Sequence, residues 1–148
     1  METRLASLQD TPILAGLHAK SFGEAAWSTT QIADSLALTT TYAVLVEEND
    51  RPLGFILCQI VQEEAEILTL CVESALRRKG TGKKLLEIAM IYAQERKARR
   101  MFLEVATDNQ AALFLYEKAG FCPIGRRKNY YHRGAQKIDA LLLEHSFA

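Results

Sequence analysis

Apolar positions along the chain follow two patterns, one typical of helices and one typical of strands. Between Gly82 and Lys97 apolar residues recur three and four positions apart with charged residues between them, as on a helix that lies on a sheet. Ile32 and Leu36 are also four apart, on a second predicted helix. Other apolar runs are short and bounded by turn residues, which favours strands. The predicted strands are residues 42–48, 53–61, 66–72, 101–106, 121–125 and 138–143.

Several short signals predict where elements begin and end. Residues 10–12, Asp-Thr-Pro, favour a helix start, and this helix is expected to run to Lys20. Ser28 and Gln31 have capping-box spacing, which predicts a second helix start. Residues 49–52, Asn-Asp-Arg-Pro, are expected to form the turn of a hairpin.

The second half of the chain predicts a crossover between parallel strands. A strand, the long helix from Gly82 and a further strand follow one another, and such connections are right-handed. Asp108 or Asn109 is expected to cap a short helix that ends before Gly120. The segment 126–137, rich in Arg, Tyr and His, is interpreted as a loop between the last two strands. The order of elements is that of a mixed α/β sheet.

Length and composition narrow the class of protein. With 148 residues, of which 49% are hydrophobic and 24% charged, the chain is expected to form one domain, 1–148, with one core. Eighteen basic and eighteen acidic residues give no net charge, so no direct nucleic-acid binding is expected. No apolar stretch is long enough for a membrane span, and a cytoplasmic protein is expected. The three cysteines lie in apolar runs typical of reduced core thiols: Cys58, Cys71 and Cys122.

Residues 77–82, Arg-Arg-Lys-Gly-Thr-Gly, lie between a predicted strand and a predicted helix. A helix N-terminus offers unpaired amides, and glycine lets a phosphate approach the backbone, so this segment predicts a pyrophosphate site. The alternative is a turn with solvated cations. Neither a Walker loop nor a dinucleotide fingerprint fits the positions of the glycines and of Lys84 and Leu85. The cations and glycines of the predicted site are Arg77, Arg78, Lys79, Gly80, Gly82, Lys83 and Lys84.

Arg-x-x-Gly-x-Gly between a strand and a helix resembles the coenzyme A-binding motif of the GNAT superfamily of N-acetyltransferases. Residues 109–121 match a second motif of that superfamily, Asn-x-x-Ala-x-x-Leu-Tyr-x-x-x-Gly-Phe, at every stated position. The resemblance extends loosely over almost the whole chain. It implies a three-layer α/β/α fold with a mixed central sheet, and acetyl-CoA as cosubstrate without a metal. The residues that it places against acetyl-CoA are Leu70, Cys71, Val72, Arg77, Arg78, Lys79, Gly80, Thr81, Gly82, Lys83 and Asn109.

Within the superfamily, residues 64–72, 102–105 and 129–131 are most similar to the RimI family. That family acetylates the N-terminal alanine of a small-subunit ribosomal protein, which implies a protein N-terminus as the partner here. The chain departs from the family's usual Phe-Pro-Trp-Ser, because it has the longer segment 22–28 instead. The alternatives are a lysine, a polyamine or another small amine as acceptor, or a coenzyme A-binding sensor without catalysis. The basic run 126–128 does not suggest the acidic pocket that a polyamine favours.

Amine acetylation needs a base for the ammonium and an acid for the leaving thiolate. Glu104 lies in an apolar strand, where a carboxylate is costly unless it is partnered or used. The resemblance assigns it the role of general base, and the alternative is an ion pair with a neighbouring lysine or arginine. Tyr116 lies on the face of its helix that is directed at the sheet, and the resemblance makes it the general acid. The alternative for Tyr116 is a tyrosine of the core.

A peptide acceptor is expected to enter between the first two helices and the loop before the last strand. Aromatic side chains concentrate there, with ordinary packing as the alternative. His132 lacks neighbours at metal-ligand spacing, so no metal site is predicted. The predicted acceptor-binding residues are Phe22, Trp27, Tyr130 and Tyr131.

Overall fold

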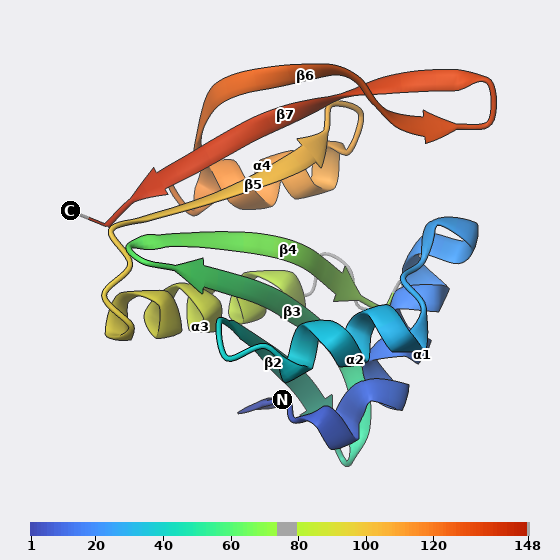
Figure 1. The fold of residues 1–148 in the computed structure, drawn as a ribbon, viewed down its shortest axis with the longest axis vertical. Helices are drawn as coiled ribbons and strands as arrows, with labels where there is room; N and C mark the ends of the chain where they lie inside the picture. The colour runs from blue at the N-terminus through green and yellow to red at the C-terminus, as the bar shows by residue number, and fades with distance from the viewer. Residues whose placement is uncertain (74–79, 148) are drawn as a thin grey trace.

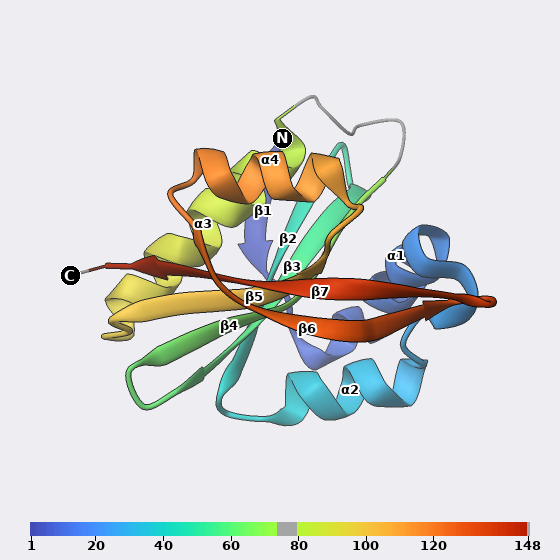
Figure 2. The same ribbon diagram turned by 90° about the horizontal axis from the view of Figure 1, so that it is seen from above.

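A computed structural model describes residues 1–73 and 80–147 and shows a seven-stranded sheet between two layers of helices (Figure 1). The strand order is β1-β2-β3-β4-β5-β7-β6. Helices α1 and α2 lie on one face of the sheet, and α3 and α4 lie on the other (Figure 2). The strands are β1 (Glu2–Leu5), β2 (Thr41–Glu48), β3 (Arg51–Val61), β4 (Glu64–Val72), β5 (Arg100–Ala106), β6 (Cys122–Arg133) and β7 (Gln136–Ser146), and the helices are α1 (Thr11–Phe22), α2 (Thr29–Ala37), α3 (Thr81–Glu95) and α4 (Gln110–Lys118).

The mixed sheet and its three layers confirm the fold predicted from the sequence. Strands β4 and β5 are parallel and are joined through α3, and the other neighbouring strands are antiparallel. The capping box of α2 is also present, since the Gln31 N–H donates to Ser28 Oγ at 3.1 Å and the Ser28 N–H donates to Gln31 Oε1 at 2.7 Å. Asn109 is the residue that caps α4, accepting from the Ala112 N–H at 3.2 Å. No helix among residues 1–73 and 80–147 is long and apolar enough to cross a membrane.

Two predictions about turns were wrong. The turn of the first hairpin consists of Asn49 and Asp50 alone, both with positive φ, and residues 51–52 already belong to β3. A two-residue hairpin turn of type I′ needs this conformation at both central residues, and asparagine and aspartate tolerate it. Residues 126–133 are part of β6 and not a loop, and the second hairpin turns at residues 134–135. Strand β1 was not predicted, because its four residues are mostly exposed and polar.

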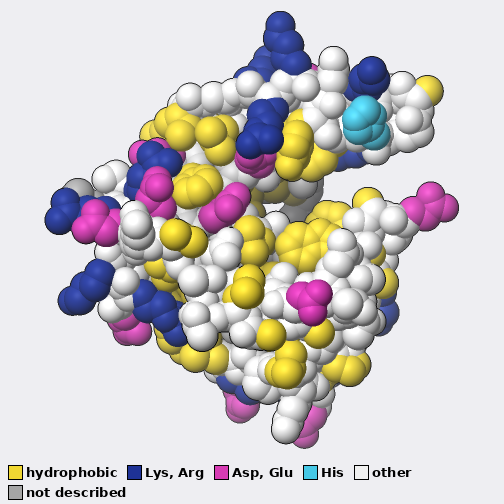
Figure 3. Space-filling model, viewed as in Figure 1, with side chains coloured by type: hydrophobic (Ala, Val, Ile, Leu, Met, Phe, Trp, Pro, Cys, Tyr) yellow, Lys and Arg dark blue, Asp and Glu magenta, His cyan; other side chains and the backbone are white. Residues whose placement is uncertain are grey.

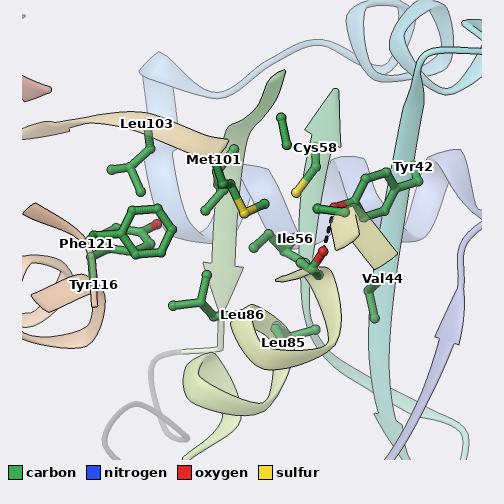
Figure 4. Close-up of a cluster of buried hydrophobic side chains, with 14 of the residues drawn as sticks. Tyr42, Val44, Ile56, Cys58, Leu85, Leu86, Met101, Leu103, Tyr116 and Phe121 are labelled. Atoms are coloured by element: carbon green, nitrogen blue, oxygen red, sulfur yellow. Dashed lines mark hydrogen bonds between the residues drawn. The ribbon is translucent and has the colours of Figure 1, made fainter. Parts of the chain in front are cut away.

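Two hydrophobic clusters hold the layers together, one on each face of the sheet. The larger lies beneath α3 and α4 and includes Leu85, Leu86 and Met101 (Figure 4). The polar group of a buried tyrosine within this cluster has a hydrogen-bond partner, because the Tyr42 hydroxyl donates to the Ala89 carbonyl at 2.6 Å. The smaller cluster lies beneath α1 and α2. Its buried members are Leu14, Leu17, Ile32, Ala43, Leu45, Phe55, Leu57 and Cys71.

The cysteines only partly match the prediction of core thiols. Cys58 and Cys71 are buried, and burial raises the pKa of Cys58 to about 12. Cys122 is exposed at the start of β6, so its prediction as a core thiol was wrong. Phe121 before it is buried, but Cys122, Pro123 and Ile124 begin the edge strand of the sheet and are exposed.

Candidate active site

The parallel strands β4 and β5 separate and leave an opening in the sheet. They pair only over residues 64–66 and 100–102, and beyond these they diverge (Figure 1). The edge of β4 from Ile67 to Val72 thus has no strand partner on its β5 side within the described part of the chain. The surface is hollowed between the hairpin β6–β7 and the part of the molecule that holds α1 and α2 (Figure 3). The unpaired edge of β4 therefore offers backbone groups to a ligand in this hollow.

Glu104 lies on β5 beside this opening. Leu103 and Val105 are buried in the cluster beneath α3 and α4, so the alternation of the strand directs Glu104 to the opposite face. Its side chain is 17% exposed, and Oε1 lies 3.1 Å from Arg127 Nη2. Oε2 is buried and has no hydrogen-bond partner among the residues that the structure describes. The ion pair considered as an alternative is therefore present, and the second carboxylate oxygen is left without a hydrogen bond.

A bulge in β6 brings further side chains to Glu104. The register of β6 and β7 shifts between Arg127 and Tyr131, so that residues 128–130 lie opposite Asp139 alone. Asn129 has a φ of 55°, and its N–H donates to Asp139 Oδ1 at 2.9 Å. This conformation is one that asparagine tolerates, and the hydrogen bond fixes the bulge.

Two of the predicted acceptor-binding residues lie next to Glu104 because of this bulge. The Tyr131 hydroxyl donates to the Glu104 carbonyl at 3.4 Å. The Tyr130 ring lies 5.1 Å from the Tyr131 ring and 5.0 Å from the Arg127 guanidinium. Burial, and secondly the negative charge of Glu104, raises the pKa of Tyr131, so its hydroxyl remains a hydrogen-bond donor. Arg127 itself was not predicted as a site residue. Its proximity to Glu104 on β5 becomes apparent only from the register of β5, β7 and β6.

A second carboxylate, Glu66, lies near Glu104 and was also not predicted. Burial raises the pKa of Glu66, and the negative charge of Glu104 raises it further, while Arg127 acts in the opposite direction. Glu66 pairs with Phe102 in the last residue pair before β4 and β5 separate. The signal in the sequence was a glutamate at the start of an apolar strand, but its proximity to Glu104 depends on strand register.

Tyr116 lies on α4, on the opposite face of the sheet from Glu104. The side chain is 5% exposed, and its ring lies 5.7 Å from that of Phe121 (Figure 4). Burial raises the pKa of Tyr116, and interactions with Cys58, Tyr131 and Cys71 add to the increase. The groups that act on the hydroxyl belong to three strands, since Cys58 lies on β3, Tyr131 on β6 and Cys71 on β4. The phenol is protonated at neutral pH, as a proton donor requires.

Comparison with known proteins identifies the family. The sequence profile described as "Acetyltransferase (GNAT) family" matches residues 13–121. The chain belongs to this family. It is an acetyl-CoA-dependent N-acetyltransferase.

Similar proteins from bacteria carry a more specific description. The [ribosomal protein bS18]-alanine N-acetyltransferase of Escherichia coli K12 is 29% identical over 140 residues, which cover 94% of each chain. A putative enzyme of the same description from Bacillus subtilis is 31% identical over 92% of this chain and 89% of its own. The crystal structure of the ribosomal-protein-S18-alanine N-acetyltransferase from Escherichia coli superposes with a TM-score of 0.90 at 26% identity, covering 99% of this chain and 95% of that one.

The predicted donor side of this acetyltransferase lies where β4 leads toward α3. Leu70, Cys71 and Val72 lie on β4 beyond the last residue pair that joins it to β5. Gly80 precedes α3 with a φ of 84°, and nothing lies within 4 Å of where its Cβ would be. An open backbone at the N-terminus of a helix fits a pyrophosphate. Arg77, Arg78 and Lys79 were also predicted here, and they lie outside the described residues.

The other predicted donor residues have different surroundings. Thr81 is buried, and its hydroxyl donates to Met1 Sδ at 3.5 Å. A Cβ on Gly82 would lie 3.4 Å from Leu115 Cδ2, so this glycine permits close packing of α3 and α4. Lys83 is exposed. Asn109 uses its side-chain oxygen to cap α4, which leaves its amide nitrogen as the donor for a ligand. Contacts of these residues with acetyl-CoA stay predictions.

The acetyltransferase also has an aromatic group on α1 around a buried histidine. The Trp27 N–H donates to His18 Nδ1 at 3.0 Å, so Nε2 carries the proton and donates to Thr69 Oγ1 at 3.2 Å. The rings of Phe22 and Trp27 lie 4.4 and 5.1 Å from the His18 ring. Burial lowers the pKa of His18, which keeps the ring neutral. Thr69 lies on β4, so His18 links the segment that holds Trp27 to the open strand.

The structure thus forms two separate groups from the four predicted acceptor residues. Phe22 and Trp27 surround His18, whereas Tyr130 and Tyr131 lie beside Glu104. No ring contact joins the two groups in the part of the chain that is described. The end of α1 and the outer part of the hairpin β6–β7 lie on opposite sides of the hollow (Figures 1 and 3). An acceptor in the hollow would therefore lie between them.

Proposed function

We propose that this acetyltransferase transfers the acetyl group of acetyl-CoA to the N-terminal amine of a protein, and that the acceptor is the N-terminal alanine of a small-subunit ribosomal protein. The descriptions of the relatives from Escherichia coli and Bacillus subtilis support this acceptor. The observation that carries the chemistry is the opening between β4 and β5, with the carboxylate of Glu104 on one face and the phenol of Tyr116 on the other.

In this mechanism Glu104 accepts one proton from the acceptor's ammonium group, directly or through a water. The freed amine then attacks the thioester carbonyl carbon, so that a C–N bond forms and the C–S bond breaks. Tyr116 gives its proton to the departing sulfur. The nitrogen loses its second proton as the amide forms, and this balances the proton that Tyr116 has given. The net products are the acetylated amine, the free thiol and one proton.

Support for the donor's position comes from two features of the chain. The unpaired edge of β4 offers backbone amides that would hold the donor's arm and polarise its carbonyl. The open backbone at Gly80 would hold its pyrophosphate at the N-terminus of α3. Acetyl-CoA supplies the activated acetyl group, and the protein supplies orientation, a base and an acid.

A panel of acceptors tests the proposal. Thiol release from acetyl-CoA is measured with a peptide that begins with the alanine terminus of a small-subunit ribosomal protein. The matched controls are the same peptide with a blocked N-terminus and an internal lysine, and a set of polyamines. We expect release with the free alanine terminus only. Release with polyamines alone, or binding of acetyl-CoA without release, would contradict the proposal.

Tyr116→Phe tests the acid. Loss of the hydroxyl should lower turnover by about 100-fold or more, as removal of a general acid does, with little change in the affinity for acetyl-CoA. Tyr92→Phe is the matched control, because Tyr92 lies on α3, where its ring packs against that of Tyr42, away from the opening. Turnover of Tyr116→Phe equal to that of the wild type would remove Tyr116 from the mechanism.

A further inference from the structure

The two carboxylates at the opening point to the same face of the sheet. Ala65 and Ile67 on β4 are buried beneath α3 and α4, so the alternation of the strand turns Glu66 to the other face. Glu104 on β5 is turned to that face for the same reason. The pair Glu66–Phe102 is the last one that joins the strands, and Glu104 lies two residues further along β5. The carboxylates therefore lie on neighbouring strands where the sheet opens.

Two carboxylates this close are unfavourable without a cation between them. Glu66 forms no ion pair with any residue in the described ranges, and its raised pKa shows the combined cost of burial and of the negative charge on Glu104. Glu104 has one oxygen that is paired with Arg127 and one that is buried and unpaired. A site whose purpose was only structural would satisfy these oxygens within the protein.

The cation that is present is the guanidinium of Arg127, an exposed and flexible side chain. Arg127 is 60% exposed and reaches Glu104 from the bulge of β6. In the same position its guanidinium lies 5.0 Å from the Tyr130 ring, a favourable contact that does not depend on the carboxylates. An exposed arginine with an alternative partner is easily displaced by a cation that fits more closely.

We propose that Glu66 and Glu104 together bind the ammonium group of the acceptor, and that Arg127 occupies its place in the free enzyme. This inference rests on the proposed acetylation of an amine and adds Glu66 as the residue that selects a primary ammonium. Such a group has three N–H donors, which suit the unpaired oxygen of Glu104 and the carboxylate of Glu66. After binding, Glu104 takes the proton and Glu66 keeps the nitrogen in place. Arg127 then keeps its contact with Tyr130 at the rim of the hollow.

Glu66→Gln separates this role from catalysis. The KM for the acceptor should rise about tenfold or more, as expected for loss of one partner of a buried charge pair, while kcat and the KM for acetyl-CoA stay nearly unchanged. Glu64→Gln is the matched control, because Glu64 lies two residues earlier on β4 and pairs with Arg100 at 2.6 Å, away from the opening. An acceptor KM of Glu66→Gln equal to that of the control would overturn the inference.

The melting temperature distinguishes a binding residue from a structural one. A raised pKa means that the folded protein holds the proton more tightly than the unfolded chain, so wild-type stability falls as the pH rises above the ordinary value of 4.5. Glu66→Gln removes this loss and should melt at a higher temperature than the wild type at neutral pH. The difference should vanish below the ordinary pKa. A lower melting temperature at neutral pH would show that Glu66 holds the fold together and would overturn the inference.

Arg127→Gln tests the displaced cation. Without the competing guanidinium, the KM for the acceptor should stay at the wild-type value or decrease. An increase of more than about threefold would show that Arg127 itself holds the acceptor, and would overturn its role as a placeholder. All three variants are assayed with the amine that the wild type acetylates best. If the wild type acetylates no amine, the proposed function fails. If it does and Glu66→Gln behaves as the control, only the present inference fails.

Discussion

The two β-hairpins of the molecule are built alike and used differently. Residues 42–46 of β2 are all buried, and β3 has a similar run, so the hairpin β2–β3 lies in the core with helices on both faces. Strand β6 has no buried residue, and β7 has only Ala140 and Leu143. Both hairpins are long and antiparallel. Hydrophobic burial therefore accounts for the first hairpin but not for the second.

The second hairpin is held instead by backbone pairing and by ion pairs. Strand β7 pairs with β5 along the whole of β5. Arg126 pairs with Asp139 at 3.1 Å, and Arg133 pairs with Asp108. Exposed ion pairs contribute little individually, so this hairpin is the less stable region. Because its side chains are not committed to a core, they are available for an acceptor. The comparison indicates that the buried half of the sheet supports the fold, and we propose that the exposed half contributes specificity.

Replacing one glycine of each hairpin by alanine should reveal the largest difference between the hairpins, in the free energy of unfolding. A Cβ on Gly54 of β3 would lie 2.5 Å from the Cys71 carbonyl oxygen, so β3 and β4 must move apart. We expect Gly54→Ala to lower the free energy of unfolding by about 1–3 kcal/mol, as overpacking does, and to lower kcat/KM for acetyl-CoA because the open edge of β4 shifts. Chemical denaturation and steady-state kinetics measure the two effects.

Gly125→Ala in β6 is the matched control for this experiment. Its Cβ would lie 3.6 Å from Leu142 Cδ2, an ordinary contact, and its φ is not positive. The change in unfolding free energy should stay within about 0.5 kcal/mol. Equal destabilisation by the two substitutions would contradict the difference between the hairpins.

The next largest effect is expected in the pH dependence of stability, which compares a histidine on each side of the hollow. Burial lowers the pKa of His18, so the folded protein binds fewer protons than the unfolded chain below the ordinary value of 6.5. Wild-type stability should therefore be complete above this pH and decrease as the pH falls below it. His18→Gln should remove this part of the pH dependence. It should also cost about 1–3 kcal/mol at neutral pH, because the Trp27 N–H and the Thr69 hydroxyl lose their partner.

His132 on β6 is exposed and serves as the control on the other side. Melting temperatures of His18→Gln, His132→Gln and the wild type are compared from acidic to neutral pH. The wild type and His132→Gln should show the same slope. An unchanged slope in His18→Gln would mean that another group causes the acid sensitivity.

The same difference between hairpins explains which parts of the fold could be predicted from the sequence. The elements of the buried half follow from apolar periodicity and from local caps such as Ser28 with Gln31, because their side chains meet a core. Strand β6 was interpreted beyond Gly125 as a loop, since polar and aromatic residues alternate there without an apolar face. Its structure comes from pairing with β7, and a partner distant in the sequence has no local signal.

The catalytic residues of the candidate site could be predicted only where the local sequence around one residue was sufficient to identify it. Glu104 and Tyr116 could be proposed because a carboxylate in an apolar strand and a complete motif are visible in the sequence. Glu66 and Arg127 could not, because their relation to Glu104 depends on the register of β4, β5 and β6. In the sequence, the basic run 126–128 does not suggest an acidic pocket. In the structure, however, Arg127 is already paired with Glu104, so that inference loses its force.

The smallest expected effect is on the KM for acetyl-CoA, and it tests the division of the site into a donor side and an acceptor side. Lys83 on α3 has a side chain that is 73% exposed and lies 3.9 Å from Glu87, so Lys83→Gln should change stability by less than about 0.5 kcal/mol. If Lys83 attracts the pyrophosphate, the KM for acetyl-CoA should rise about threefold at low ionic strength and less in high salt. Lys128→Gln on β6 is the matched control and should leave this KM unchanged. Equal KM values in the two variants at low salt would remove Lys83 from the donor side and leave the backbone at Gly80 as the element there that the structure supports.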